Sequence, residues 1–153
     1  MDDMTSTPSI KRRLVNLVNR GIVGLQRLGL AFGPTQLLLV RGRKSGQPRT
    51  FPIAVIGLFG ERYIFQAFPR AAWVANARSA DTVTLRRGRT DTTVRLQLVP
   101  VADRPPLLRE LVRLSARNGK RLVANGLAAS PTPEGAAASA DRIAVFKVLP
   151  AAA

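Results

Sequence analysis

Six short segments of the sequence have the residue pattern of β-strands, and tight turns join several of them. They are an apolar run at 36–40, β-rich segments at 49–59 and 62–68, alternating segments at 82–87 and 92–100, and a closing segment at 142–150. Turns at 59–61 and 88–91 would make two hairpins, so these strands should pair antiparallel. Pro52 indicates an edge position or a bulge, because proline cannot donate to a strand ladder. The sequence therefore predicts an α+β fold on a β-barrel of about six mostly antiparallel strands.

The segment 10–28 is predicted to form a basic amphipathic helix. Its apolar residues recur every three or four positions, and its five Lys or Arg side chains fall mostly on other faces. Two interpretations stay open, in which the helix packs on the domain or lies on an anionic membrane surface. Residues 1–9 are polar and are expected to be loose, and residues 10–150 are expected to form one domain.

Two further helices and one irregular stretch are expected. One helix covers 71–79. The next begins after Asp103 as its N-cap, with prolines at 105 and 106 in the first turn and Gly119 as a plausible C-cap. Residues 126–140 have a low-complexity composition rich in Ala, Pro, Ser and Gly. We expect this stretch to be a loop or a mobile flap.

The sequence contains no cysteine and no histidine. Disulfides and thiolate nucleophiles are therefore excluded, as are zinc sites built on Cys or His and catalysis by Ser-His-Asp groups. The nine Asp and Glu residues are widely scattered, and nothing indicates a carboxylate pair for acid–base work. If the protein is an enzyme, a cofactor is expected to carry the chemistry. The lack of cysteine fits a cytoplasmic location, with peripheral membrane association through 10–28 as an alternative.

The net charge of +15 is unevenly distributed. Between Met4 and Gly60 there is no acidic residue and there are nine Lys or Arg. Such a field attracts anions, namely phosphates, nucleic acid, acidic lipid or a polyanionic cofactor. Nucleic acid is the least favoured of these partners, because only 5% of the residues are aromatic and no RNA-binding signature is present.

The stretch "RGRKSGQPR" (41–49) concentrates this charge between two predicted strands. Glycines at 42 and 46 allow a sharp turn that can present backbone N–H groups to an anion. Arg43 and Arg49 offer paired donors to phosphate or carboxylate, and Lys44 adds a point charge. The alternative is a solvated basic hairpin with no ligand.

A second candidate stretch is "AAWVANAR" (71–78). On a helix, Trp73, Asn76 and Ala77 share one face. Trp73 is interpreted either as a core residue or as the wall of a site for a flat ring. In the second case Asn76 can hydrogen-bond one edge of that ring.

Together these stretches resemble the deazaflavin-dependent nitroreductase family. The resemblance rests on "LLLVRGRKSGQPRTFPIAV", "ERYIFQA" and "AAWVANARSADTVTLRRG", and more weakly on the closing "DRIAVFKVLP". It implies a split β-barrel that binds coenzyme F-420, a deazaflavin with a phosphate and a polyglutamate tail. It also implies hydride transfer from the reduced coenzyme to an electron-poor small molecule such as an enone, a quinone or a nitro compound.

Carried over residue by residue, the resemblance implies a complete cofactor site. Arg43, Lys44 and Arg49 would hold the phosphate and the acidic tail, assisted by Ser45 and Gly46. The ring would be enclosed by residues from three later segments, namely Pro52, Ile53, Gln66, Ala67, Trp73 and Asn76. No catalytic residue and no metal ligand is predicted.

The sequence also departs from the better-known nitroreducing members. The segment before Trp73 is shortened to "FPR" (68–70), and the only tyrosine is Tyr63, in a predicted strand. The substrate pocket should therefore differ. Alternatives to a reductase are a cofactor- or lipid-binding protein without turnover and an FMN-dependent enzyme. The protein is expected to be a monomer or a homodimer.

Overall fold

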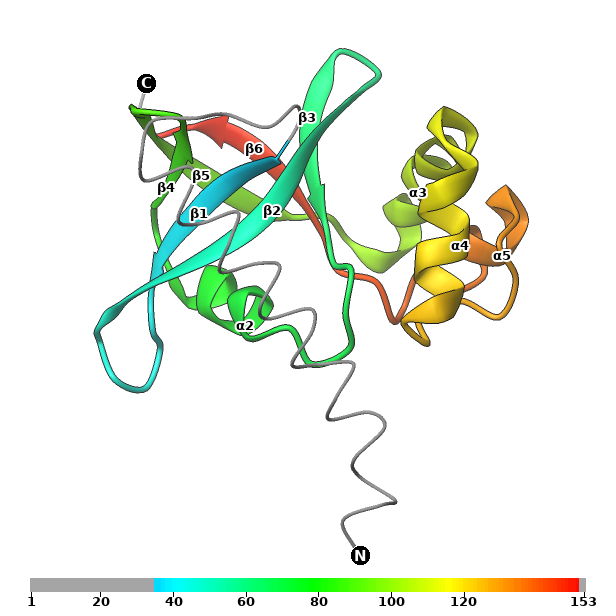
Figure 1. Cartoon of the computed structure of the whole chain (residues 1–153), viewed down its shortest axis with the longest axis horizontal. Helices are drawn as coiled ribbons and strands as arrows, with labels where there is room; N and C mark the ends of the chain where they lie inside the picture. Colours follow the sequence, from blue (N-terminus) through cyan, green and yellow to red (C-terminus); the bar gives the residue numbers. More distant parts are fainter. Residues whose placement is uncertain (1–34, 152–153) are drawn as a thin grey trace, which may run out of the picture.

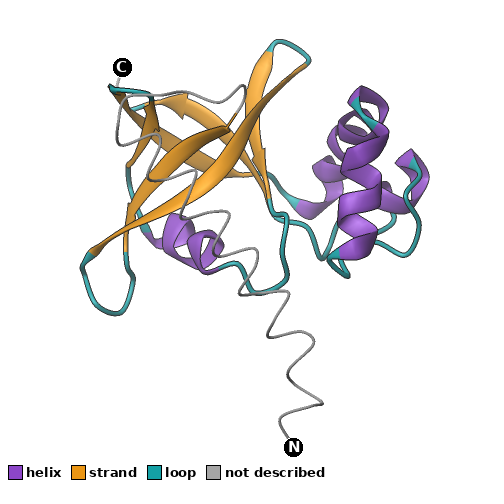
Figure 2. Ribbon diagram, in the orientation of Figure 1, coloured by secondary structure: helices purple, strands orange, loops and turns teal. Residues whose placement is uncertain are grey.

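The computed structural model describes residues 35–151, and their strands form a closed antiparallel barrel (Figures 1 and 2). The order around the barrel is β1-β2-β3-β6-β5-β4, and β4 returns to β1. The strands are β1 (Thr35–Arg41), β2 (Pro48–Leu58), β3 (Glu61–Phe65), β4 (Val83–Arg87), β5 (Thr90–Leu98) and β6 (Val145–Pro150). The predicted fold class, the six strands and their antiparallel pairing are confirmed.

The barrel interior is filled by every second residue of its strands, because side chains alternate between the two faces of a strand. Leu38 and Val40 of β1, Ile64 of β3 and Phe146 of β6 belong to one buried cluster. The helix α2 (Ala72–Ser79) adds Trp73, Val74 and Ala77 to the same cluster. Figure 1 shows α2 beneath the barrel, beside the end where the β1–β2 loop lies. The predicted helix 71–79 is thus confirmed, and it closes one end of the barrel.

Both predicted hairpins are present with two-residue turns. In the first, Leu58 pairs with Glu61, and the turn residues Phe59 and Gly60 have φ angles of 51° and 77°. Two successive positive φ angles are typical of the type I′ turn, which matches the twist of a hairpin. In the second hairpin Arg87 pairs with Thr90.

Pro52 lies in the half of β2 that pairs with β1 alone. It stands opposite Leu37, whereas the pairing of β2 with β3 begins only at Val55. Its missing N–H is therefore tolerated, as expected for a strand with one free side.

The helical part beyond β5 contains α3 (Arg104–Leu114), α4 (Ala116–Ala124) and α5 (Pro133–Ala137), preceded by a short 3-10 turn at Val101–Asp103. Asp103 occupies the N-cap position of α3, as predicted, but its side chain makes no capping hydrogen bond. The prediction that Gly119 ends this helix is wrong. The chain breaks at Ser115, whose hydroxyl caps α4, and Gly119 lies inside α4.

Gly119 is needed for packing and not for termination. A Cβ atom at this position would clash with the carbonyl oxygen of Pro131. The glycine therefore lets the backbone of α4 approach the segment 126–140.

The segment 126–140, predicted to be a loop or a flap, contains α5 and is largely packed. Ala136 is completely buried, and it joins Leu108, Leu122 and Ile143 in a second cluster between the helices and the outer face of the barrel. The low-complexity composition predicts an irregular segment, but its small side chains allow α5 to lie close against α3.

Arg104 links the helices to the barrel. Its side chain is only 4% exposed and donates from Nε to Val99 O at 2.8 Å and from Nη1 to Ala140 O at 2.9 Å and Ile143 O at 3.3 Å. Burial lowers the pKa of this guanidinium, and the nearby charge of Arg78 lowers it further. A single cation thus holds the end of β5, the end of the α5 segment and the start of β6 together.

The predictions for residues 1–9 and for the amphipathic helix 10–28 lie outside the described residues. Within 35–151, no helix combines the length and the apolar character that crossing a membrane requires.

Candidate functional site

The basic stretch forms a tight loop between β1 and β2. Gly42 N–H donates to Gln47 O at 2.8 Å, and Gly46 N–H donates to Gly42 O at 2.9 Å. Gly46 has a φ of 71°, a conformation that favours glycine. The Ser45 hydroxyl accepts from Gln47 N–H. The loop is thus an ordered turn with internal hydrogen bonds.

Asn76 of α2 anchors this loop from 33 residues away. Its side-chain oxygen Oδ1 accepts from the backbone N–H of Arg43 at 3.2 Å and from Arg43 Nη1 at 3.1 Å. Asn76 is only 2% exposed, so its amide is fixed inside the protein. The structure therefore brings together two of the predicted site residues, and α2 sets the position of the loop.

Several donors at this place have no acceptor. With Oδ1 facing Arg43, the Nδ2 group of Asn76 donates to nothing within 35–151, and neither do the backbone N–H groups of Lys44 and Ser45. A buried amide nitrogen without an acceptor is costly. The arrangement therefore offers three N–H donors that an anionic or carbonyl-bearing ligand could satisfy.

The cations of the stretch also lack acidic partners. Among the described residues, none of Arg41, Arg43, Lys44 and Arg49 forms a salt bridge. Arg49 instead places its guanidinium carbon 5.9 Å from the ring centre of Phe51, two residues along β2. This contact can orient Arg49 while leaving its N–H groups exposed.

Of the apolar residues predicted to enclose a ring, some are buried in the barrel core and others are only half-buried. Ile53 and Trp73 are buried in the barrel cluster, and Trp73 packs against Phe146 with ring centres 5.5 Å apart. Pro52 is half-buried on β2. At 7% exposure, Trp73 is a core residue in this structure, and its role as a ring wall stays a prediction.

Gln66 and Ala67 lie just after β3 and bind other parts of the chain. The side-chain oxygen of Gln66 accepts from Ala144 N–H at 3.0 Å, and its Nε2 donates to Phe68 O at 2.8 Å. Ala67 O accepts from Asn125 Nδ2 at 2.8 Å. The Gln66 amide is therefore already used at both ends, and its predicted contact with a ring is untested.

Two features of the site were not predicted from the sequence. One is the bond between Arg43 and Asn76, which joins two stretches that were interpreted separately. The other is Phe146, whose contact with Trp73 depends on β6 entering the barrel between β3 and β5. Among the described residues, no group of three or more Asp and Glu is placed to hold a metal ion.

No protein-family model matches the sequence, and no curated protein matches it. Solved structures do match. A structure described as a domain-swapped dimer is 17% identical, with a TM-score of 0.54 over 93% of this chain and 98% of that one. An F420-H2 dependent reductase, FDR-A, is also 17% identical, with a TM-score of 0.52 over 78% of this chain and 96% of that one.

The Agrobacterium tumefaciens protein Atu2129, of unknown function, is 15% identical, with a TM-score of 0.53 over 84% of this chain. This chain spans 53% of the length of Atu2129. At such identities the likeness concerns the fold alone. The chain has the split β-barrel fold that it shares with these proteins.

Proposed function

We propose that the protein binds the deazaflavin coenzyme F-420 on the loop 42–47 and the neighbouring face of α2. The observation that carries the proposal is a group of four cations, in and beside a loop that buried Asn76 holds in place, without acidic partners among residues 35–151. Exposed positive charge that is fixed in position suits a ligand with several negative charges. The phosphate and polyglutamate tail of this coenzyme meet that description.

The donors around the loop fit the same ligand. Arg43 and Arg49 can each make paired hydrogen bonds to phosphate or carboxylate, and Lys44 adds charge without fixed geometry. The N–H groups of Lys44 and Ser45 suit phosphate oxygens. The Nδ2 group of Asn76 suits a carbonyl at the edge of a ring.

The reduced coenzyme, when bound, supplies a hydride to an electron-poor small molecule such as an enone, a quinone or a nitro compound. The residues of this chain would bind and orient the coenzyme. The described residues contain no histidine or cysteine that could move a proton. This absence suits a reaction in which the protein mainly positions the reactants. The fold shared with an F420-H2 dependent reductase supports the proposal without deciding the cofactor.

A fluorescence titration tests the binding. Trp73 is the only tryptophan, and it lies in α2 with Asn76. We expect saturable quenching by oxidised F-420, with FMN weaker because it lacks the acidic polyglutamate tail. Arg49→Ala should weaken F-420 binding by about 1.5–3 kcal/mol, which is roughly 10- to 150-fold in Kd.

Arg117→Ala is the matched control, since Arg117 is exposed on α4 and this helix lies far from the β1–β2 loop in Figure 1. Its Kd for F-420 should equal that of the unchanged protein. Equal Kd values for all three proteins would remove Arg49 from the site. Tighter binding of FMN than of F-420 would replace the proposed cofactor. If F-420 binds but no enone, quinone or nitro acceptor oxidises its reduced form, the protein is a binding protein without turnover.

A further inference from the structure

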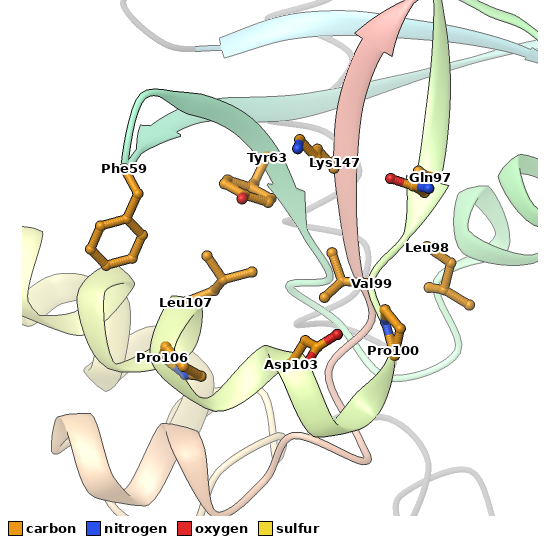
Figure 3. Close-up of a pocket in the computed structure, with 10 residues that line it drawn as sticks. All are labelled: Phe59, Tyr63, Gln97, Leu98, Val99, Pro100, Asp103, Pro106, Leu107 and Lys147. Atoms are coloured by element: carbon orange, nitrogen blue, oxygen red, sulfur yellow. The ribbon is translucent and has the colours of Figure 1, made fainter.

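A cavity of about 480 Å³ lies between the tip of the β2–β3 hairpin, the strands β5 and β6, and the start of α3 (Figure 3). This tip and the loop 42–47 are at opposite ends of β2, whose eleven residues span about 33 Å at ~3.3 Å per residue. The cavity is therefore separate from the proposed cofactor site. The cavity is open to solvent on one side, and its volume is in the range of small-molecule sites.

Phe59 forms one wall of the cavity from an unfavourable backbone conformation. It occupies the first position of the type I′ turn with a φ of 51°, where Asn or Gly is preferred and a bulky residue is an outlier. Its side chain is 67% exposed and belongs to neither buried cluster. The ring thus contributes little to the core, and strained residues of this kind gather at binding sites.

Tyr63 supplies a polar group to the same cavity. The residue is 8% exposed, and its hydroxyl makes no hydrogen bond to any residue of 35–151. Figure 3 shows the side chains of Tyr63 and Lys147 next to each other on one wall, with Leu107 across from them. A tyrosine hydroxyl at the cavity wall without a partner among these residues is a donor and acceptor available to a ligand.

One cation and two carboxylates lie at or beside the cavity. Lys147 has its Nζ 3.5 Å from Glu61 Oε1, and Asp103 on the opposite wall carries a carboxylate that does not cap α3. An anionic ligand would therefore meet two carboxylates and would find Lys147 already paired. The remaining walls include the apolar side chains of Val99 and Leu107.

We propose that this cavity binds an aromatic molecule that carries a hydroxyl or a carbonyl group and no negative charge. The aromatic part lies between Phe59 and Leu107 and covers the exposed Phe59 ring, which removes apolar surface from water. The polar group meets the Tyr63 hydroxyl. This site is independent of the F-420 proposal, and either can fail without the other.

The test uses 2-naphthol as the probe and the full chain labelled on its Leu and Val methyl groups for NMR. We expect saturable shifts of the methyl signals of Val99 and Leu107, with the methyl groups of Val40 beside the loop 42–47 unchanged. Naphthalene-2-sulfonate, the anionic analogue, should bind at least 10-fold more weakly. Equal binding of both probes, or shifts centred on Val40, would overturn the proposal.

Two variants locate the contacts. Tyr63→Phe keeps the ring and removes the hydroxyl, so the Kd for 2-naphthol should rise about 3- to 10-fold, as expected for one hydrogen bond. Phe59→Asn should weaken binding while the melting temperature stays equal or rises, because Asn suits the turn. Phe68→Asn, the control, removes an exposed phenylalanine outside the cavity and should leave the Kd unchanged. An unchanged Kd in both Tyr63→Phe and Phe59→Asn would refute the site.

Discussion

Arg104 offers the sharpest test of how the helices are joined to the barrel. Replacing it with Met keeps a side chain of similar length and removes the guanidinium. Three buried carbonyl oxygens, on Val99, Ala140 and Ile143, then lose their donor. The three carbonyl acceptors remain buried. The substitution therefore removes only the donor of each hydrogen bond and does not replace both partners by apolar groups.

The magnitude follows from the three bonds. The two short ones, at 2.8 and 2.9 Å, each involve a charged donor, and such bonds contribute about 1.5–3 kcal/mol each. The third is longer, at 3.3 Å, and shares Nη1 with the second, so we assign it little. Removing a buried cation also relieves its desolvation cost, which lowers the pKa of Arg104 in the folded protein. We therefore expect a net loss of about 2–4 kcal/mol in the free energy of unfolding.

The assay is equilibrium unfolding in urea, followed by Trp73 fluorescence and by far-UV circular dichroism. The two probes should give coincident transitions with an unchanged m-value, so that the shift of the midpoint reports stability. Arg104→Lys serves as the comparison, because it retains the charge and can reach one carbonyl but lacks the guanidinium fork. It should lose less stability than Arg104→Met. A loss below about 1 kcal/mol for Arg104→Met would show that the three carbonyls do not depend on the guanidinium.

Two other predictions concern stability. Gly119→Ala should destabilise the protein by about 1–3 kcal/mol in thermal unfolding, because the new Cβ would clash with Pro131 O. In an exposed helix with free space the same change stabilises by ~1 kcal/mol. A rise in melting temperature would therefore contradict the close approach of α4 to Pro131. The Arg86 guanidinium hydrogen-bonds the Asp91 carboxylate and lowers its pKa below the ordinary 3.8. This contribution is present above pH 3.8 and is lost as the pH falls through the lowered pKa. The stability difference between the unchanged protein and Asp91→Asn should therefore shrink on acidification, and a constant difference would argue against the ion pair.

The barrel could be predicted from the sequence because its strands carry their own signals. The alternation of apolar and polar residues in 92–100 and the apolar run at 36–40 are local patterns that can be seen in the sequence. Short turns between neighbouring strands then require antiparallel pairing. The helical part was less predictable. A glycine often follows the end of a helix, so Gly119 suggests a helix end in the sequence. Only the close approach of its backbone to Pro131 explains why α4 continues through this position.

The candidate site was predictable in its charge and not in its geometry. Arg43, Lys44 and Arg49 stand out in sequence because no acid is near them. The hydrogen bonds of Asn76 to Arg43 depend on how α2 packs under the barrel, which local patterns do not specify. The cavity beside Phe59 and Tyr63 was the least predictable feature, because it lies between a hairpin tip and the start of α3 and so depends on how these two elements pack.

The place of β6 in the barrel has a consequence for the order of events during synthesis. β6 follows every other strand in the sequence, yet it lies between β3 and β5. While the ribosome still holds residues 145–150, both β3 and β5 have an unpaired edge. Open edges of this kind can pair with another nascent chain. Closing the barrel also requires contacts between segments some 80 residues apart, such as Ile64 with Phe146, and long-range closure of this kind is slow. The interval before β6 is released is therefore the time at which this protein is most exposed to misassembly and most dependent on chaperones.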